Sequence, residues 1–165
     1  MSLLEIRGLS VRFGGLTAVS RLDLDVEEGS LVALIGPNGA GKTTAFNVIT
    51  GLYAPSDGSV RFDGREIGGV APHRISALGI ARTFQNIRLF RSLSALDNVR
   101  AALQGSRRNG ASDVLRLGGW IASERASEVE ARGLLDELAL GAFAEARADS
   151  LPYGEQRRLE IARAL

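Results

Sequence analysis

The sequence predicts an α/β protein, and three features of its pattern support this fold class. Residues 22–26 alternate between apolar and acidic side chains, which is the pattern of a strand with one buried face. Residues 31–35 form a continuous apolar run, as expected of a strand buried on both faces. From residue 93 onward the pattern is mostly helical. We therefore expect an antiparallel β segment, an α/β core and a helical subdomain.

The elements of the first half follow from apolar patterning and from glycine and proline positions. A glycine-rich stretch follows the apolar run and leads into a helix over about 42–50, which Gly51 closes as the C′ residue. Turn residues on both sides delimit a short strand over 59–62. A proline opens a short helix over 72–78, and residues 80–84 are expected to form a further strand.

The second half is predicted to hold two helices. Ser94 suits the N-cap of a helix over 95–104. Residues 105–119 are rich in Gly, Ser, Arg and Asn and predict a loop. A second helix is expected over 123–138. We expect three regions: a β segment with the α/β core over 1–92, a helical subdomain over 93–153, and a last helix over 154–165.

Composition narrows the class of protein. The chain has 165 residues, of which 45% are apolar and 24% charged, so it can bury a core. A net charge of +1 gives no strong field toward nucleic acid or an anionic membrane, and the absence of cysteine excludes disulfides and thiolate metal sites. Among its 20 basic residues only Lys42 is a lysine. A compact ammonium is suited to a narrow phosphate site, whereas the planar fork of arginine is not.

Residues 36–43 read Gly-Pro-Asn-Gly-Ala-Gly-Lys-Thr and match the phosphate-binding P-loop at every fixed position, between a predicted strand and a predicted helix. Glycines let successive N–H groups face phosphate oxygens, and a helix N-terminus favours anions. Lys42 is expected to reach the β- and γ-phosphates, and the Thr43 hydroxyl to ligate Mg²⁺. The alternative is a strand–helix turn without a ligand. The residues expected to bind nucleotide here are Gly36, Asn38, Gly39, Ala40, Gly41, Lys42, Thr43 and Thr44.

Three further segments carry a family resemblance. Phe13 precedes the P-loop within Val-Arg-Phe-Gly-Gly, Gln85 ends Ala-Arg-Thr-Phe-Gln, and residues 151–165 read Leu-Pro-Tyr-Gly-Glu-Gln-Arg-Arg-Leu-Glu-Ile-Ala-Arg-Ala-Leu. In this order and spacing, the chain resembles the ATP-binding subunit of ABC transporters. Residues 81–90 and 151–165 resemble the branched-chain amino acid importer subfamily in particular. The ATPases of urea or amide importers and of lipopolysaccharide exporters resemble this chain over much of the same sequence.

The resemblance implies roles outside the P-loop. Phe13 matches the aromatic residue that stacks on adenine, and the alternative is a core position in a strand. Gln85 matches the glutamine that touches Mg²⁺ and the attacking water, so it is expected to be catalytic together with Lys42. Gly154 lies in the signature segment, residues 151–156, which binds the γ-phosphate of ATP on the opposite subunit. Here Pro152 removes a hydroxyl of the usual signature, and Arg157 is expected to be a solvated helix residue.

The resemblance also implies cofactors, partners and location. They are ATP and Mg²⁺, a second ATP-binding subunit in a homodimer or heterodimer, and transmembrane permease subunits. No nucleic acid is expected, and the protein would be cytoplasmic, touching the membrane only through its partners. The function implied is ATP hydrolysis that drives transport. A nucleotide-binding fragment without turnover, the ATPase of a related exporter, and a soluble ATPase acting on DNA or ribosomes are the alternatives.

The family's later residues do not appear in this chain. The family places an Asp-Glu pair at the end of a strand after the signature helix, and this sequence ends at Leu165. The Asp-Glu pair at 136–137 precedes the signature and is expected on an amphipathic helix. His73 is expected on a helix surface. The sheet is therefore expected to expose an apolar edge, with marginal stability or an intermolecular contact as the result.

Overall fold

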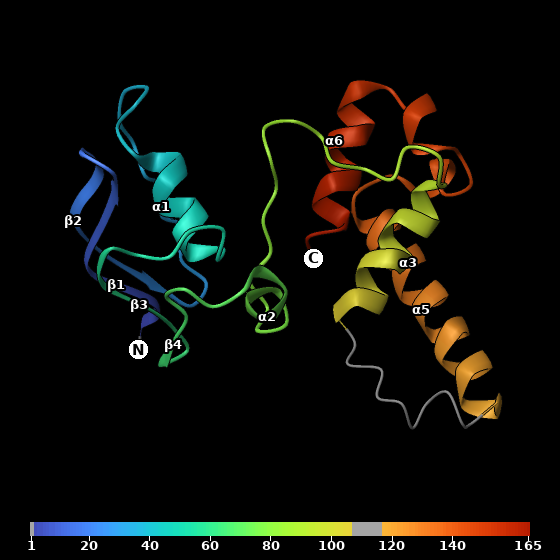
Figure 1. The fold of residues 1–165 in the computed structure, drawn as a ribbon. Helices are drawn as coiled ribbons and strands as arrows, with labels where there is room; N and C mark the ends of the chain where they lie inside the picture. Colours follow the sequence, from blue (N-terminus) through green and yellow to red (C-terminus); the bar gives the residue numbers. More distant parts are fainter. Residues whose placement is uncertain (1, 107–116) are drawn as a thin grey trace. The chain divides into compact units, whose positions relative to one another are not determined.

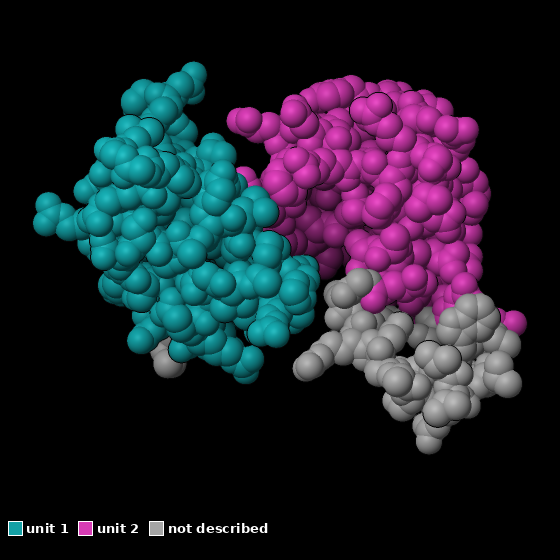
Figure 2. Space-filling model, in the orientation of Figure 1, with its two compact units in different colours: residues 1–80 teal, residues 81–165 magenta. Residues whose placement is uncertain are grey.

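The computed structural model describes residues 2–106 and 117–165, and the chain forms two compact units (Figure 1). Unit 1 comprises residues 1–80 and unit 2 comprises residues 81–165 (Figure 2). Each unit has a hydrophobic core of its own. Among the described residues, no helix combines the length and the apolar character that a membrane span requires.

Unit 1 is built on an antiparallel sheet with the strand order β2-β1-β3-β4. The strands are β1 (Ser2–Phe13), β2 (Leu16–Glu27), β3 (Asp57–Phe62) and β4 (Arg65–Glu66). Along 22–26, half-buried apolar residues alternate with exposed acidic ones, as the sequence predicts. The predicted strand over 59–62 is also confirmed, as part of β3.

Two helices complete unit 1, α1 (Lys42–Ile49) and α2 (Pro72–Ser76). Pro72 occupies the first turn of α2, where a missing N–H costs no hydrogen bond. Both predicted helices are confirmed, although α2 ends earlier than expected, and His73 is exposed on α2 as predicted. The helices and the sheet share a core made of Ile6, Leu9, Val11, Val48, Val60, Ile67 and Ile75.

The end of α1 requires glycine. The N–H of Gly51 donates to the carbonyl of Val48 at 3.0 Å, and the N–H of Leu52 donates to that of Asn47 at 2.8 Å. Gly51 has a φ of 75°, and a Cβ there would lie 2.3 Å from the carbonyl oxygen of Val70. A left-handed backbone and a close contact both exclude other side chains. The predicted C′ role of Gly51 is confirmed.

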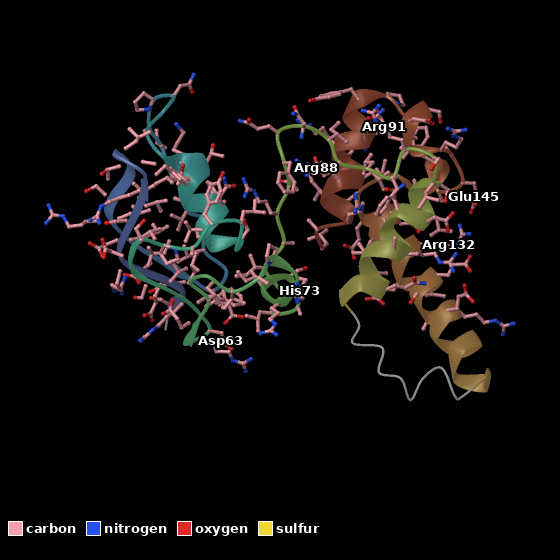
Figure 3. All side chains as sticks on the ribbon, viewed as in Figure 1. Asp63, His73, Arg88, Arg91, Arg132 and Glu145 are labelled. Carbon is pink, nitrogen blue, oxygen red and sulfur yellow. The ribbon has the colours of Figure 1, made fainter. Side chains whose placement is uncertain are left out.

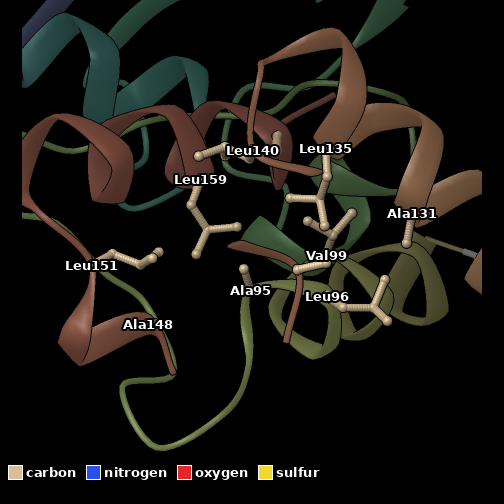
Figure 4. Packing of buried hydrophobic residues seen from close by; sticks show 11 residues of the cluster. Ala95, Leu96, Val99, Ala131, Leu135, Leu140, Ala148, Leu151 and Leu159 are labelled. Atoms are coloured by element: carbon tan, nitrogen blue, oxygen red, sulfur yellow. The ribbon is translucent and has the colours of Figure 1, made fainter. Parts of the chain in front are cut away.

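Unit 2 is helical, with α3 (Ala95–Ser106), α5 (Leu117–Glu137), the short 3-10 helices η1 (Gly141–Phe143) and η2 (Ala148–Ser150), and α6 (Tyr153–Ala162). The hydroxyl of Ser94 accepts a hydrogen bond from the N–H of Asp97 at 3.0 Å, which confirms the predicted cap of α3. Figure 4 shows the core between these elements, which includes Ala95, Leu96, Val99, Ala131, Leu135, Leu140, Ala148, Leu151 and Leu159.

Both predicted helices of unit 2 are confirmed, and both are longer than predicted. The predicted loop over 105–119 was therefore too long, because its first two residues belong to α3 and its last three to α5. The rest of that loop, residues 107–116, lies outside the described residues. In α5, Leu135 is buried while Asp136 and Glu137 are exposed, so this Asp-Glu pair lies on an amphipathic helix as predicted.

The predicted strands over 31–35 and 80–84 are wrong, because neither segment belongs to a strand. Leu31 is 99% exposed and Ile35 is 91% exposed. A strand buried on both faces exists only through backbone pairing with neighbouring strands. The antiparallel sheet among the described residues offers residues 31–35 no such neighbour. At Phe84, side chains of α6 take the backbone hydrogen bonds that a strand neighbour would take.

The end of α5 repeats the hydrogen-bond pattern of α1 without its glycine. The N–H of Ala139 donates to the carbonyl of Asp136 at 3.0 Å, and the N–H of Leu140 donates to that of Leu135 at 2.7 Å. Leu140 and Leu135 both lie in the core, which is the apolar contact typical of this motif. Ala139 has a φ of 54°, a left-handed conformation that its Cβ disfavours.

We expect Ala139→Gly to raise the free energy of unfolding by about 0.5–1 kcal/mol. The left-handed conformation costs a residue with a Cβ roughly 1–2 kcal/mol, which glycine avoids. Glycine also loses more conformational entropy on folding than alanine, and this offsets part of the stabilisation. The measurement is urea unfolding followed by circular dichroism. The matched variant Gly51→Ala should instead destabilise the chain, because its Cβ would meet the carbonyl of Val70. A lower free energy of unfolding in Ala139→Gly would contradict the left-handed conformation of Ala139 at the end of α5.

Candidate nucleotide-binding site

The phosphate loop, residues 36–43, runs directly into α1. Gly39 and Gly41 adopt left-handed φ angles of 85° and 82°, and the N–H of Ala40 donates to the carbonyl of Pro37 at 3.2 Å. A Cβ on Gly36 would lie 3.2 Å from the Cβ of Ala40, so the loop is tightly turned. Such alternation of backbone conformation directs successive N–H groups toward one side, which is how a loop holds an anion.

Gly41 is the point at which the loop is fixed to the sheet of unit 1. A Cβ on Gly41 would lie 2.2 Å from the carbonyl oxygen of Ala18 and 3.0 Å from a methyl group of Val19. Ala18 is the extra residue of a bulge in β2, because the pairing of β1 with β2 passes over it. The loop backbone therefore packs directly on this bulge, and only glycine fits at position 41.

The first turn of α1 is open to an anion. Gly41 is the N-cap and supplies no side-chain hydrogen bond, and the turn contains no acidic residue. The first N–H groups of a helix have no partner within the helix, and the helix dipole adds a partial positive charge. Thr43 is exposed and Thr44 is half-buried in this turn. Exposed Asn38 lies in the preceding loop. A phosphate group fits such a helix end.

The ammonium of Lys42 lies over the loop. Its Nζ donates to the carbonyl oxygens of Gly36 at 2.5 Å and Pro37 at 2.6 Å. An ammonium has three donors, so these two bonds leave one donor for a further acceptor. The positive charge is thus held beside the uncapped end of α1, and the two features attract the same kind of ligand.

Phe13 ends β1 and is 46% exposed. Its ring meets that of Tyr53 edge to face, with the ring centroids 5.2 Å apart and an interplanar angle of 75°. Phe13 pairs with Leu16 across the β1–β2 hairpin, two residues before Ala18 in β2. The register therefore brings Phe13 to the same end of the hairpin as the bulge that contacts Gly41. An exposed aromatic ring can stack on a base.

Gln85 lies in unit 2, in the irregular segment 81–92, and is exposed. Its backbone and that of Phe84 are held by α6. The N–H of Phe84 donates to Oε1 of Glu160 at 3.2 Å, and the guanidinium of Arg157 donates to the carbonyls of Phe84, at 2.7 Å, and of Gln85. Arg157 is therefore not the solvated residue that the sequence predicted. Its spacing of three residues from Glu160 on one helix was the available signal.

Gly154 lies in the first turn of α6, whose N-cap is Pro152. A Cβ on Gly154 would meet no atom within 4 Å, so the fold of this chain does not require glycine there. Glu155 places an acidic group in the same turn, where Arg158 pairs with it at 2.6 Å. The structure thus brings Phe13 and the phosphate loop together in unit 1, and places Gln85 and Gly154 in unit 2.

Comparisons with known proteins agree on one family. The sequence profile of the family described as ABC transporter matches residues 19–165. The chain is 46% identical over 164 residues to the high-affinity branched-chain amino acid transport ATP-binding protein BraF of Pseudomonas aeruginosa. It is 38% identical over 164 residues to LivG of Escherichia coli K12, which carries the same description. Each match covers 99% of this chain and 64% of the relative, so the chain spans less than two thirds of their length.

Solved structures give the same result for the fold. The chain matches the ADP conformation of MJ1267, an ATP-binding cassette of an ABC transporter, with a TM-score of 0.83 and 30% identity, over 100% of this chain and 65% of that one. It matches the dimeric post-hydrolysis state of the cassette MJ0796, bound to ADP and Pi, with a TM-score of 0.77 and 26% identity, over 98% and 68% of the two chains. The predicted α/β fold with a P-loop core is confirmed.

We expect Gly41→Ala to abolish nucleotide binding and to destabilise the chain. The matched control is Gly29→Ala, because Gly29 also has a positive φ, of 71°, but a Cβ there would meet no atom within 4 Å. The control should lower the free energy of unfolding by only about 0.5–1 kcal/mol, the same net backbone effect as at Ala139, whereas Gly41→Ala adds the clash with Ala18. Urea unfolding and ATP binding by isothermal titration calorimetry measure both effects. Equal costs for the two variants would contradict the close contact at Ala18.

Proposed function

Because this chain belongs to the ABC transporter family, we propose that it is the nucleotide-binding part of an ATP-hydrolysing subunit that powers the import of branched-chain amino acids. The observation that carries the proposal is the phosphate loop packed on the β2 bulge, with the Lys42 ammonium beside an uncapped helix end. The descriptions of BraF and LivG support the class of solute. The subunit would work in the cytoplasm, at the membrane through permease partners.

The proposed binding roles follow from the chemistry of each group. The loop N–H groups and Lys42 bind the phosphates, and Phe13 stacks on adenine. The exposed hydroxyl of Thr43 and the carboxamide of Gln85 are proposed as the protein ligands of Mg²⁺, which neutralises phosphate charge when bound. Among the described residues, no cluster of His, Cys, Asp or Glu side chains could hold a metal ion. Hydroxyl, amide and phosphate oxygens fit Mg²⁺ without such a cluster.

Gly154 is proposed to act on the nucleotide of a second subunit. Its open surroundings allow another backbone or a phosphate to approach closely, and it lies in the first turn of α6, where N–H groups are oriented for an anion. The dimeric cassette MJ0796, which the chain resembles, makes a second ATP-binding subunit a reasonable partner.

A second candidate is nucleotide binding without turnover by these 165 residues. The observation that favours it is the position of the single Asp-Glu dipeptide, Asp136 and Glu137, on an exposed face of α5. Hydrolysis in P-loop enzymes needs a group that orients the attacking water and an acidic group near Mg²⁺. Asp136 and Glu137 are exposed on a helix of unit 2, whereas the phosphate loop belongs to unit 1.

Phosphate release with MgATP, measured beside ATP binding, separates these two candidates. We expect the chain to bind ATP and Lys42→Ala to bind it at least tenfold more weakly, since a charge-assisted hydrogen bond contributes roughly 1.5–3 kcal/mol. We expect no phosphate release from either chain. Turnover that disappears in Lys42→Ala would instead support hydrolysis by the chain itself. Equal ATP binding by both chains would contradict the assigned phosphate site.

Import is tested in a chimera. This chain replaces the matching 164 residues of BraF, and uptake of labelled leucine is measured in Pseudomonas aeruginosa cells that lack BraF. We expect uptake to return, because the segments resembling the importer subfamily lie within the exchanged part, and to be lost again with Lys42→Ala. A folded chimera that binds ATP but restores no uptake would count against the importer and favour a related exporter.

A further inference from the structure

Glu160 is a buried carboxylate whose partners include a distant segment of the chain. It is 6% exposed and lies on α6. Its Oε1 accepts from the N–H of Phe84 at 3.2 Å, and its Oε2 accepts from Arg157 at 3.1 Å. A charge buried this deeply is tolerated only when partners satisfy it. One partner here is a backbone N–H far away in sequence, so the carboxylate fixes another segment as well as its own helix.

Arg157 holds the same segment through its fork of N–H groups. It donates to two successive carbonyl oxygens, those of Phe84 and Gln85, and also to Glu160. With the hydroxyl of Tyr153 the guanidinium has four acceptors, which its five donors in a planar fork can serve and the three donors of an ammonium cannot. The same guanidinium donates to the hydroxyl of Tyr153 at 3.0 Å, which ties it to the first turn of α6.

The backbone at Gln85 is therefore fixed while its side chain stays available. Within the described part of the chain, the carboxamide of Gln85 has no hydrogen-bond partner, and the residue is exposed. The side chain of Phe84 is also confined, because the guanidinium groups of Arg82 and Arg88 lie 4.9 Å and 4.5 Å from the centre of its ring. The fixed main chain therefore sets the point from which the Gln85 side chain extends, while the carboxamide stays available to a ligand.

We propose that Arg157 and Glu160 are positioning residues for Gln85, and that through them the first turn of α6 sets where the backbone of Gln85 lies and so which region its carboxamide can reach. The inference deepens the proposed function, because it rests on the role given there to Gln85. It assigns to two side chains of α6 the task of holding Gln85, in addition to the task proposed for Gly154. Neither residue touches the nucleotide in this proposal.

Amide hydrogen exchange tests whether the pair holds the segment. In Arg157→Ala and in Glu160→Ala, we expect the amide of Phe84 to exchange at least roughly tenfold faster, because its acceptor is lost or displaced. Glu160→Gln should restore much of the protection, because a carboxamide oxygen can still accept from that N–H. The control is Arg132→Ala, which removes ion pairs to Glu128 and Glu145 in the same unit (Figure 3). It should leave Phe84 unchanged.

The Mg²⁺ dependence of ATP affinity tests whether the pair acts through Gln85. The quantity measured is the ratio of the ATP dissociation constants without and with Mg²⁺, in the 165-residue chain. We expect Gln85→Ala to lower this ratio, Arg157→Ala and Arg157→Lys to lower it in the same direction, and the Gln85→Ala, Arg157→Ala double variant to lower it no further. A general loss of stability would weaken ATP binding equally in both conditions and leave the ratio unchanged.

Two results would overturn the positioning role. One is exchange at Phe84 in Arg157→Ala that matches the Arg132→Ala control. The other is a double variant whose ratio falls by the product of the two single effects, since the arginine would then act independently of Gln85. If instead the proposed role of Gln85 as a Mg²⁺ ligand is wrong, Gln85→Ala itself would leave the ratio of the ATP dissociation constants unchanged. Any role of Arg157 through Gln85 would fail with it.

Discussion

Unit 2 depends on one requirement, that the backbone groups of a chain segment without a strand partner must still be hydrogen-bonded. Buried side chains meet that requirement. Asn98, fully buried on α3, donates to the carbonyl of Phe90 at 3.0 Å and accepts from its N–H at 2.9 Å. Glu160 and Arg157 do the same at Phe84. The helices that form the core are thereby also the partners of the segment that carries Gln85, so the packing of unit 2 and the position of this segment depend on the same side chains.

Unit 1 solves a different problem, which is to hold a flexible glycine-rich loop in one conformation. The carbonyl of Ala18 in the bulge lies against the loop at position 41, and glycine is the only residue type that fits there. The helix that follows is short, and its last turn is closed by Gly51 in the same left-handed conformation. Two glycines at the two ends of α1 thus fix the helix between the sheet and α2, and its uncapped first turn results from the first of them.

The sequence predicted most of the elements but not their environment. Local signals were sufficient for the alternation in β2, for the Ser94 cap and for Gly51, because each depends on residues a few positions apart. The strands over 31–35 and 80–84 were wrong because a strand depends on its neighbours, which local patterning does not reveal. The match of residues 36–43 to the P-loop pattern could be recognised from spacing alone. The hydrogen bond from Arg157 to the Gln85 carbonyl joins positions 72 residues apart, and its only local sign in the sequence is the spacing of Arg157 and Glu160.

The position of Lys42 also means that the phosphate loop can be labelled selectively by a reagent that reacts with amines. Lys42 is the only lysine of the chain, so a reagent that acylates amines can modify two groups, this side chain and the amino terminus. The side chain is half-buried, and its Nζ is engaged with two loop carbonyls, both of which slow its reaction. Once the amino terminus is blocked, labelling therefore reports on the one remaining amine, which is the group that a phosphate would cover, and a tag placed there occupies the loop itself.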